Sequence, residues 1–313
     1  MVRRSAAGFA GRIPHRAGSR YSIRPMARQR MIVGLGEVLL RESPEGSEAA
    51  GLAAEVALRA ARLGQRGAVI SRVGQDEPGN ELLAILQDAG VETSHVQTDP
   101  DLPTGRVVVR AVGGSVARYV ESRAAFDNLQ WDFDLEDAAQ QADAVIYGML
   151  TRRSGQTRSE ENRFLRACTA ALKVFDGTHS GDQAVDRSHV RSGLEHADIA
   201  LLDHASVAAV LPVRSDEAGP EEAAAVLRET GLSLVVLATG RGGRTAMSVH
   251  GGPRDGQIMI ASDRASVVWA LVALVLGIVQ GRELTAALAF AQRVADFSRE
   301  RPTEPVPPDW LEG

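Results

Sequence analysis

Short apolar runs alternate with longer stretches of helical spacing along most of the chain. An apolar run bounded by glycine or polar residues predicts a buried strand, and apolar positions three and four residues apart predict a helix. The predicted strands are 31–35, 67–73, 144–147, 174–176, 199–202 and 233–237, and the predicted helices are 53–63, 80–89, 160–172, 221–230, 266–280 and 283–297. This alternation predicts an α/β fold whose mainly parallel sheet is covered by helices on both faces.

A predicted hairpin interrupts that alternation. Segments 106–112 and 116–120 are rich in β-branched residues and flank Gly113, Gly114 and Ser115, which favour a tight turn. We interpret the hairpin as a small antiparallel appendage at one end of the sheet. Ligands of parallel α/β folds bind at the carboxyl ends of the strands, so a site is expected at the carboxyl edge of the predicted sheet.

The segment 262–281 is the most apolar part of the sequence. Ser262 or Asp263 can cap a helix whose body reads VVWALVALVLGIV. A helix that is apolar on every side is predicted to lie buried. Its amino terminus would face the ligand edge, where it could attract a phosphate. The side chains of Ala265, Ser266 and Val267 would crowd an anion that approaches those backbone N–H groups.

The composition excludes several classes of site and protein. The 313 residues are 44% hydrophobic, enough for one large globular domain. Cys168 is the single cysteine, which excludes an intramolecular disulfide and a cysteine-based zinc site. The histidines lack metal-ligand spacing, so no metal site is predicted. The longest apolar run, 267–279, is too short to span a bilayer, and we expect no membrane association.

Charge is distributed unevenly along the chain. Residues 1–30 contain eight arginines and no acidic residue, and without them the formal net charge falls from −5 to −13. The acidic body argues against a nucleic-acid partner. Residues 1–30 resemble an organelle transit peptide, but we interpret them as a disordered basic tail or a start codon assigned too early. The proline-rich residues 301–313 are expected to form an extended C-terminal tail.

An ordered set of motifs resembles the ribokinase-like (PfkB) carbohydrate kinases, and especially their fructokinase-like branch. The matching stretches are MIVGLGEVLL, ALRAARLG, VGQDEPGNELLAILQDAGVETSHVQTDPDLPTGRVVV, RAAFDNL, ADAVIYGML, LKVFD and VVLATGRGG. The resemblance implies a three-layer αβα sandwich over 31–300 and a small β lid from about 37–50 and 104–122. It also implies transfer of phosphate from Mg-ATP to a sugar hydroxyl, with a catalytic Asp and anion-hole glycines in the motif DTxGAGD.

The positions that carry this chemistry in the family differ here. The DTxGAGD motif falls on 262–268 or 263–269, so the base position is Val268 or Trp269, and the anion-hole glycines become Ala, Ser or Val. The NxxE motif linked to magnesium reads DHAS at 203–206. A general base contributes roughly 10²–10⁴ in rate and one oxyanion donor about 10²–10³, so these replacements predict little remaining turnover.

The resemblance also assigns the binding residues. It places the substrate pocket at Arg41, Gly51, Glu55, Asp176 and His179, where Arg41 replaces an Asp and Glu55 replaces an Asn of the family pattern. The DxNLR motif reads DGTHS at 176–180, so it keeps Asp176 and loses the Asn and the Arg, and His179 stands at the Leu position. The nucleotide loop retains Gly240 and Gly243.

Three functions remain open at this stage. The first is a catalytically impaired sugar-kinase homologue that binds a sugar or charged sugar derivative in the old cleft. The alternative is an active, fructokinase-like sugar kinase that uses Mg-ATP, with Asp263 as its base. The third is a regulatory subunit that forms a homodimer through the lid or a heterodimer with an active relative. In each case we expect a cytoplasmic protein.

Overall fold

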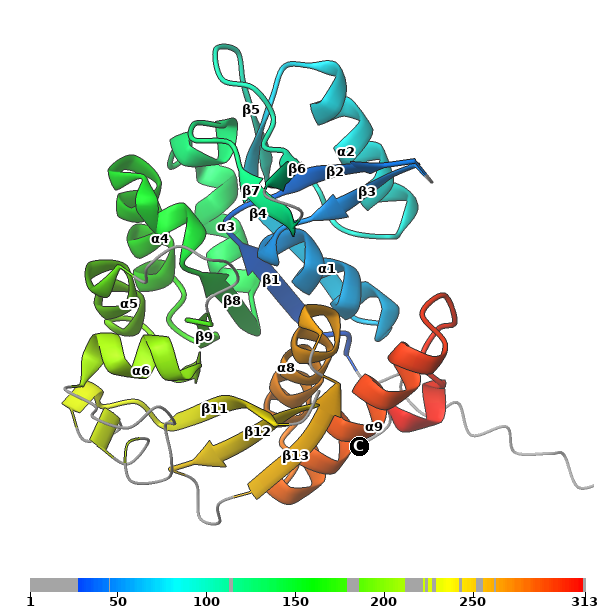
Figure 1. Ribbon diagram of the computed structural model, residues 1–313, viewed down its shortest axis with the longest axis vertical. Helices are drawn as coiled ribbons and strands as arrows, with labels where there is room; N and C mark the ends of the chain where they lie inside the picture. The colour runs from blue at the N-terminus through cyan, green and yellow to red at the C-terminus, as the bar shows by residue number, and fades with distance from the viewer. Residues whose placement is uncertain are drawn as a thin grey trace, which may run out of the picture.

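The computed structural model describes residues 28–311, except 45, 113–114, 179–185, 212–221, 223–224, 227–228, 242–243, 252–255 and 262. A nine-stranded sheet runs through the molecule (Figure 1) in the order β13-β12-β11-β10-β9-β8-β1-β4-β5. The strands are β1 (Met31–Leu35), β4 (Arg66–Gly74), β5 (Val96–Asp99), β8 (Ala144–Gly148), β9 (Leu172–Asp176), β10 (Ile199–Leu202), β11 (Leu234–Arg241), β12 (Arg244–His250) and β13 (Gly256–Ala261).

Seven neighbouring strands, from β11 to β5, are parallel, whereas β12 and β13 add to the sheet as antiparallel strands. Helices cover both faces, as the alternating pattern predicts. The helices are α1 (Leu52–Arg62), α2 (Glu77–Asp88), α3 (Phe133–Gln141), α4 (Gly155–Ala167), α5 (Arg187–Leu194), α6 (His204–Val210), α8 (Arg264–Val279) and α9 (Leu284–Glu300). The fold is therefore the predicted α/β sandwich of three layers.

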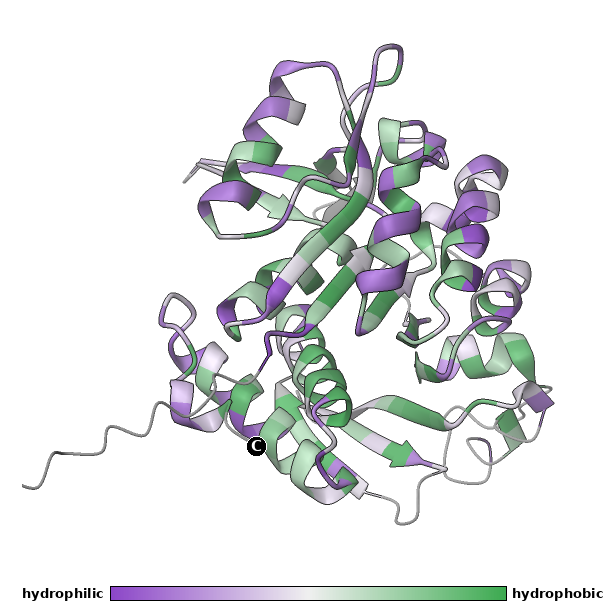
Figure 2. Cartoon of the chain, turned by 180° about the vertical axis from the view of Figure 1, so that it is seen from behind, coloured by the Kyte–Doolittle hydropathy of each residue, from purple (hydrophilic) through white to green (hydrophobic). Residues whose placement is uncertain are grey.

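Two hydrophobic clusters fill the layers on either side of the sheet. The first contains residues of α1, α8 and α9, and the second contains residues of α3 to α6. Viewed from behind, the central strands are mainly hydrophobic, while the peripheral helices carry both hydrophilic and hydrophobic residues (Figure 2). Every residue of α8 from Ser266 to Gly277 is buried, which explains why that helix is apolar all round.

Two hairpins lie side by side next to the sheet (Figure 1). They are β2 (Leu39–Ser43) with β3 (Gly46–Ala50), and β6 (Val107–Val112) with β7 (Ser115–Val120). The Leu40 N–H donates to the Gly105 carbonyl over 2.9 Å, and this bond joins the start of one hairpin to the entry of the other. We call β2–β3 and β6–β7 together the paired hairpins. They occupy the two segments in which a lid is expected.

The ends of the chain differ from the sequence expectation. The segment 301–311 was expected to be extended, but it folds back and forms a 3₁₀ turn, η3 (Pro308–Trp310). Its Val306 is buried, and the Trp310 ring packs edge-on against Phe297 of α9 with 5.3 Å between ring centroids. Apolar burial outweighs the weak local preference of this proline-rich segment. At the other end, Arg30 pairs with Asp143 over 2.9 Å.

Two predicted helices require comment. The helix expected at 160–172 begins earlier, because Ser154 caps it, and ends at Ala167, so Leu172 lies in β9 instead. The helix expected at 221–230 lies largely outside the described residues. Across the part of the chain that the structure describes, no helix combines the length and the apolar character that crossing a bilayer requires.

Candidate functional site

The carboxyl ends of β1, β8, β9 and β10 meet at one edge of the sheet, because these strands are parallel and adjacent. The amino termini of α1 and α8 face that edge. Five charged residues gather there: Glu37 after β1, Glu55 and Arg59 on α1, Asp176 at the end of β9, and Arg264 at the start of α8. We call them the edge cluster. Such an edge is where α/β proteins bind ligands.

Arg264 closes the gap between β9 and α8. Its Nη2 atom lies 2.6 Å from Asp176 Oδ2, and its Nη1 donates to Thr178 Oγ1 over 2.6 Å. The other carboxylate oxygen of Asp176 accepts from the Thr178 N–H and hydroxyl. Burial lowers the pKa of Arg264, but the charge and hydrogen bond of Asp176 outweigh burial, and the net shift is upward. Arg264 is therefore a fixed cation.

Arg59 connects α1 to the first turn of α8. It bonds Glu55 on its own helix, with Nη2 3.4 Å from Oε2 and Nη1 2.8 Å from the backbone carbonyl. Its guanidinium also reaches the Ala265 carbonyl at 3.5 Å and lies 5.5 Å from the centre of the Trp269 ring. Burial lowers the pKa of Arg59 to about 10, which leaves the group charged at neutral pH. Arg59 holds the two helices together at the edge.

Glu37 lies at the base of the edge cluster. Its Oε1 accepts from the Leu52 N–H over 2.9 Å and thereby caps α1, whose N-cap residue Gly51 has no side chain for this purpose. Its Oε2 is buried without a hydrogen-bond partner among the described residues. Burial raises the pKa of Glu37. Gly51 has a φ of 90°, and a Cβ there would lie 2.5 Å from the Glu37 carbonyl, so only glycine fits.

A second buried acid lies behind Gly36. Glu161 of α4 is fully buried and accepts a hydrogen bond from the Thr151 hydroxyl, while its Oε2 has no hydrogen-bond partner within the described ranges. Burial raises the pKa of Glu161 to about 7, and the charge of Glu37 adds to this shift. The nearby Arg152 is also fully buried and packs over the Tyr147 ring at 5.3 Å. Ionisable groups thus continue from the edge into the body.

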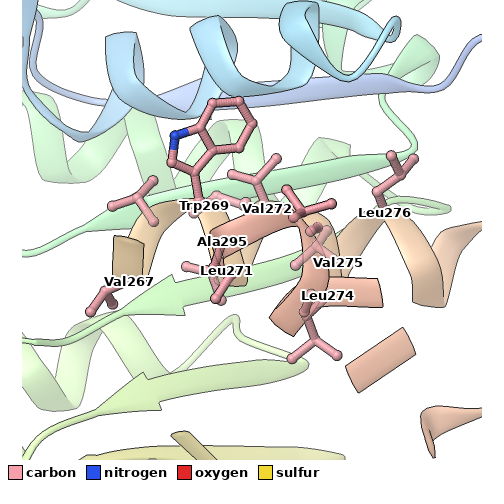
Figure 3. Packing of buried hydrophobic residues seen from close by; sticks show 14 of the residues in the cluster. Val267, Trp269, Leu271, Val272, Leu274, Val275, Leu276 and Ala295 are labelled. Atoms are coloured by element: carbon pink, nitrogen blue, oxygen red, sulfur yellow. The ribbon is translucent and has the colours of Figure 1, made fainter. Parts of the chain in front are cut away.

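The positions expected for the catalytic base hold core side chains. Val268 is fully buried and Trp269 is 7% exposed, and both belong to the cluster around α8. Figure 3 shows the Trp269 indole pointing away from α8 toward the neighbouring α1, beside other apolar side chains of the same helix. Neither side chain can accept a proton, so neither register of the expected motif supplies a base.

Asp263 has a structural role in this arrangement. Of the two candidate caps, it is the N-cap of α8: its Oδ1 accepts from the Ser266 N–H over 2.7 Å, and its Oδ2 accepts from the Ser266 hydroxyl over 2.8 Å. The residue itself is exposed. The N–H of Ser266 is therefore already paired, and the first turns of α8 carry the side chains of Ala265 and Val267, or of Ser266 and Val268 in the other register, where the family has glycines.

The residues at the positions that the resemblance links to Mg-ATP differ from the family pattern. Asp203, at the NxxE position, caps α6 through the Ser206 N–H, and Ser206 stands where the metal-linked Glu is expected. Among the described residues, no group of three His, Cys, Asp or Glu side chains could hold a metal ion. Gly240 lies on β11 opposite Thr245, and a Cβ there would meet nothing within 4 Å.

The structure separates the candidate pocket residues into two groups. Gly51, Glu55 and Asp176 lie at the carboxyl edge of the sheet with Arg264. Arg41 lies instead on the hairpin β2–β3, where its Nε pairs with Glu48 of the opposite strand over 2.9 Å. His179 and Gly243 lie outside the described residues.

Sequence reasoning missed three members of the edge cluster: Glu37, Arg59 and Arg264. The turn after β1 gave a usable signal, since Gly36 and Glu37 follow a buried strand at the ligand edge. Arg59 pairs with Glu55 at i,i+4 on its own helix, but its contact with α8 is 206 residues distant in sequence, and Arg264 and Asp176 are 88 residues apart, so no local signal places either arginine at the edge.

Comparison with known proteins gives consistent results. A family model described as pfkB family carbohydrate kinase matches residues 27–262. The 2-dehydro-3-deoxygluconokinase of Thermoproteus tenax is 25% identical over 217 residues, which cover 62% of this chain and 61% of that relative. The alignment therefore spans about three fifths of the relative's length.

Solved structures show the same fold. The 2-dehydro-3-deoxygluconokinase of Thermotoga maritima superposes with a TM-score of 0.75 at 17% identity, covering 91% of this chain and 98% of that one. An uncharacterized sugar kinase of Pyrococcus horikoshii in complex with ATP superposes with a TM-score of 0.65 at 19% identity, covering 90% and 94%. The family match covers three quarters of the sequence and stops immediately before Asp263, the cap of α8. The chain thus belongs to the pfkB family of carbohydrate kinases.

Proposed function

We propose that this protein is a catalytically impaired sugar-kinase homologue that binds a small ligand at the edge cluster. The observation that carries the proposal is the first half of α8. Both expected base positions, Val268 and Trp269, are buried in the core, and Arg264 pairs with Asp176 in front of the turn that should form the anion hole. The fold of the family is retained while these groups serve packing and ion pairing.

The expected loss of rate is large. A general base contributes roughly 10²–10⁴ and an oxyanion donor about 10²–10³, and this turn supplies neither in the family's arrangement. Ser206 in place of the metal-linked Glu adds to the loss. Together these changes support ligand binding without efficient phosphate transfer.

The charges of the edge cluster support a sugar or a charged sugar derivative as ligand. Glu55 replaces a neutral amide of the family pattern, and Arg264 is about one third exposed at the same edge. Both charges are paired within the protein, Glu55 with Arg59 and Arg264 with Asp176, and these pairs can hydrogen-bond either sugar hydroxyls or a charged group of the ligand. Binding of fructose or of 2-dehydro-3-deoxygluconate, the compounds suggested by the sequence resemblance and by the relatives' names, tests the two ligand types directly.

The first experiment is titration calorimetry of Mg-ATP on the full chain, followed by ADP release with both compounds. We expect no nucleotide binding below millimolar concentration and no ADP release above the background without sugar. A thermal shift with either compound would support the ligand-binding role. Micromolar Mg-ATP binding together with sugar-dependent ADP release would contradict the proposal.

One observation favours the alternative of an active kinase. Asp263 is an exposed carboxylate at the amino terminus of α8, at the ligand edge of the sheet. If it is the base, Asp263→Asn abolishes ADP release, although asparagine still caps the helix because its side-chain oxygen also accepts from Ser266. Ser266→Ala is the matched control, since it disturbs the same cap and keeps the carboxylate. Equal ADP release by wild type and Asp263→Asn would exclude this alternative.

A regulatory role through assembly is the remaining proposal. The paired hairpins would form the contact in a homodimer or in a heterodimer with an active relative. Sedimentation velocity of the full chain tests this role, and a monomer at 50 μM or so without a co-purifying partner would argue against it.

A further inference from the structure

A cavity lies beside the hairpin β6–β7, and none of its lining residues belongs to the edge cluster. Its volume is about 440 Å³, within the roughly 300–1,000 Å³ of small-molecule sites. Both connections of the hairpin line it: Asp101 and Leu102 lead toward β6, and Ser122 and Arg123 leave β7. The opposite wall comes from the body of the protein. The remaining lining residues are Asp99, Asp127, Asn128, Arg153, Ser154 and Gln156. We call this space the hinge cavity.

Two of its three carboxylates are already neutralised by the protein. Asp99 is 2.8 Å from Arg72 Nε, accepts from Asn128 Nδ2 over 2.7 Å, and accepts from the N–H groups of Asp101 and Leu102. Asp127 receives a two-pronged bond from Arg153, with distances of 2.9 and 2.7 Å. Such charge-assisted, bidentate pairs are strong and geometrically fixed. These groups build the wall of the cavity.

One cation of the lining remains available. Arg123 is exposed and has neither a hydrogen bond nor an ion pair with any part of the chain that the structure describes. Arg153 next to it is held in place by Asp127 and by the Phe126 ring, 4.9 Å from its guanidinium carbon. The other lining groups, including Ser122, Asn128 and Gln156, offer hydroxyl and amide groups. Guanidinium groups bind carboxylates and phosphates, and side-chain hydroxyls and amides bind sugar hydroxyls.

We propose that the hinge cavity binds a small polyhydroxylated acid, carboxylated or phosphorylated, with its acidic group on Arg123. Because the ligand would contact both connections of β6–β7 and the body at Arg153 and Gln156, its binding restrains the hairpin. None of the lining residues belongs to the edge cluster. The site is therefore independent of the ligand site proposed above.

Calorimetry on the full chain tests the ligand class. The probes are gluconate for the carboxylate, glucose 6-phosphate for the phosphate, and glucose as the neutral comparison. We expect one of the two acids to bind and glucose to bind at least tenfold more weakly, since a hydrogen bond to a charged group accounts for about that factor. No binding of either acid at 10 mM, about the weakest affinity that such a pocket would use, overturns the proposal.

Two variants locate the binding. Arg123→Gln weakens binding of the acid about tenfold or more, whereas Arg299→Gln, an exposed arginine at the end of α9, leaves it unchanged. Equal binding by wild type and Arg123→Gln overturns the assignment. Arg264→Met, which breaks the edge cluster, leaves acid binding at the hinge cavity intact. Loss of binding in Arg264→Met but not in Arg123→Gln would place the ligand at the edge cluster instead.

Hydrogen exchange tests the effect on the hairpin. Saturation with the acid is expected to slow exchange of the backbone amides of β6 and β7, and not those of β12 and β13, which lie at the far end of the sheet. An unchanged rate in β6 and β7 at saturation overturns the proposed restraint of the hairpin.

Discussion

Two acidic sites of this protein use their residues in opposite ways. In the turn after β4, Asp76 accepts from the Gly79 N–H over 2.9 Å, from the Thr104 N–H over 2.9 Å and from the Thr104 hydroxyl over 2.5 Å. A Cβ at Gly74 or Gly79 would collide with backbone at 2.7 or 2.4 Å. In the edge cluster, by contrast, charged side chains pair with one another, and Asp176 bonds Arg264 across two distant segments.

The two regions differ in what their residues do: the Asp76 turn holds the backbone in place, whereas the edge cluster lies where the family carries out its chemistry. The Asp76 turn lies in the stretch that resembles the family over its whole length, and each of its motif residues satisfies a backbone requirement. In the edge cluster, Glu37, Arg59 and Asp176 lie in stretches that resemble the family, whereas Glu55 and Arg264 lie where the sequence departs from it. A family-like pattern in the Asp76 turn and departures from it at Glu55 and Arg264 are what the proposed role, a retained fold without efficient phosphate transfer, requires.

The strongest test restores the family's acid at its expected position. Trp269→Asp would bury an unpaired carboxylate and leave a cavity between α8 and α1, since Trp269 is 7% exposed. We expect a loss of more than about 4 kcal/mol in the free energy of unfolding, and no gain of ADP release. Urea denaturation measures the loss. A stable variant with sugar-dependent ADP release would show that a carboxylate at position 269 can act as the base, and would contradict the expectation that this position serves only packing.

The next test removes the carboxylate of the Asp76 turn. Asp76→Ala leaves the Gly79 and Thr104 N–H groups without their acceptor and should cost about 3 kcal/mol. Asp88→Ala, an exposed aspartate at the end of the same helix, is the matched control and should cost less than about 0.5 kcal/mol. Similar melting temperatures of the two variants would mean that the turn does not stabilise the fold.

The two regions should also differ in their pH dependence. Burial raises the pKa of Glu161, behind the edge cluster, to about 7 from 4.5, so its contribution is full below about pH 4.5 and declines as pH rises through 7. At one pKa unit per 1.36 kcal/mol this amounts to up to about 3 kcal/mol. Glu161→Gln should remove that decline between pH 5 and about 8 in urea denaturation.

Asp76 provides the opposite sign. Burial raises its pKa, but the hydrogen bonds from Thr104 and Gly79 outweigh burial and the net shift is downward. Its stabilisation is therefore present above the ordinary aspartate pKa and is lost as pH falls through the lowered value. Asp76→Asn should therefore destabilise the protein at neutral pH, and its difference from wild type in urea denaturation should shrink as pH falls through the lowered pKa. If Glu161→Gln and Asp76→Asn changed the free energy of unfolding in the same direction at pH 8, the two regions would not differ in their pH dependence as expected.

The smallest effect is expected for the ion pair of the edge cluster. Arg264→Met leaves the buried Asp176 carboxylate without its cation, and because the Arg264 side chain is 35% exposed we expect a cost of about 2 kcal/mol. The double variant Asp176→Asn with Arg264→Met should recover most of it. A double-mutant cycle by thermal denaturation measures this coupling, and a coupling near zero would mean that the pair is not formed in solution.

Much of the fold could be predicted from local pattern. The strand at 31–35 is found as β1 with the predicted bounds, and the strand at 67–73 is found one residue longer at each end as β4. The pattern predicts no strand at β12 or β13 and no helix at α3. The sequence of α3, FDLEDAAQQ, buries only Leu135, Ala138 and Ala139, so too few apolar residues mark it as a helix.

The candidate site was predictable only in part. Asp176 and Gly51 were assigned through the resemblance to the family, and Asp263 was one of two candidate caps, with Ser262, before an apolar segment. The partners of these residues could not be predicted. Arg264 and Asp176 are 88 residues apart, and nothing in either local segment indicates which cation meets which carboxylate.

The sequence by itself determined the alternating elements, the buried nature of α8 and the absence of a proton acceptor at either expected base position. These properties depend on residue type and on spacing along the chain, because hydrophobic burial and helix capping act over a few residues. Only the tertiary structure decided that Arg59 contacts α8 at Ala265 and Trp269, that Arg264 meets Asp176, and that two hairpin connections line a cavity with Arg123. Those contacts depend on how separate elements pack, since an ion pair forms wherever packing brings opposite charges together.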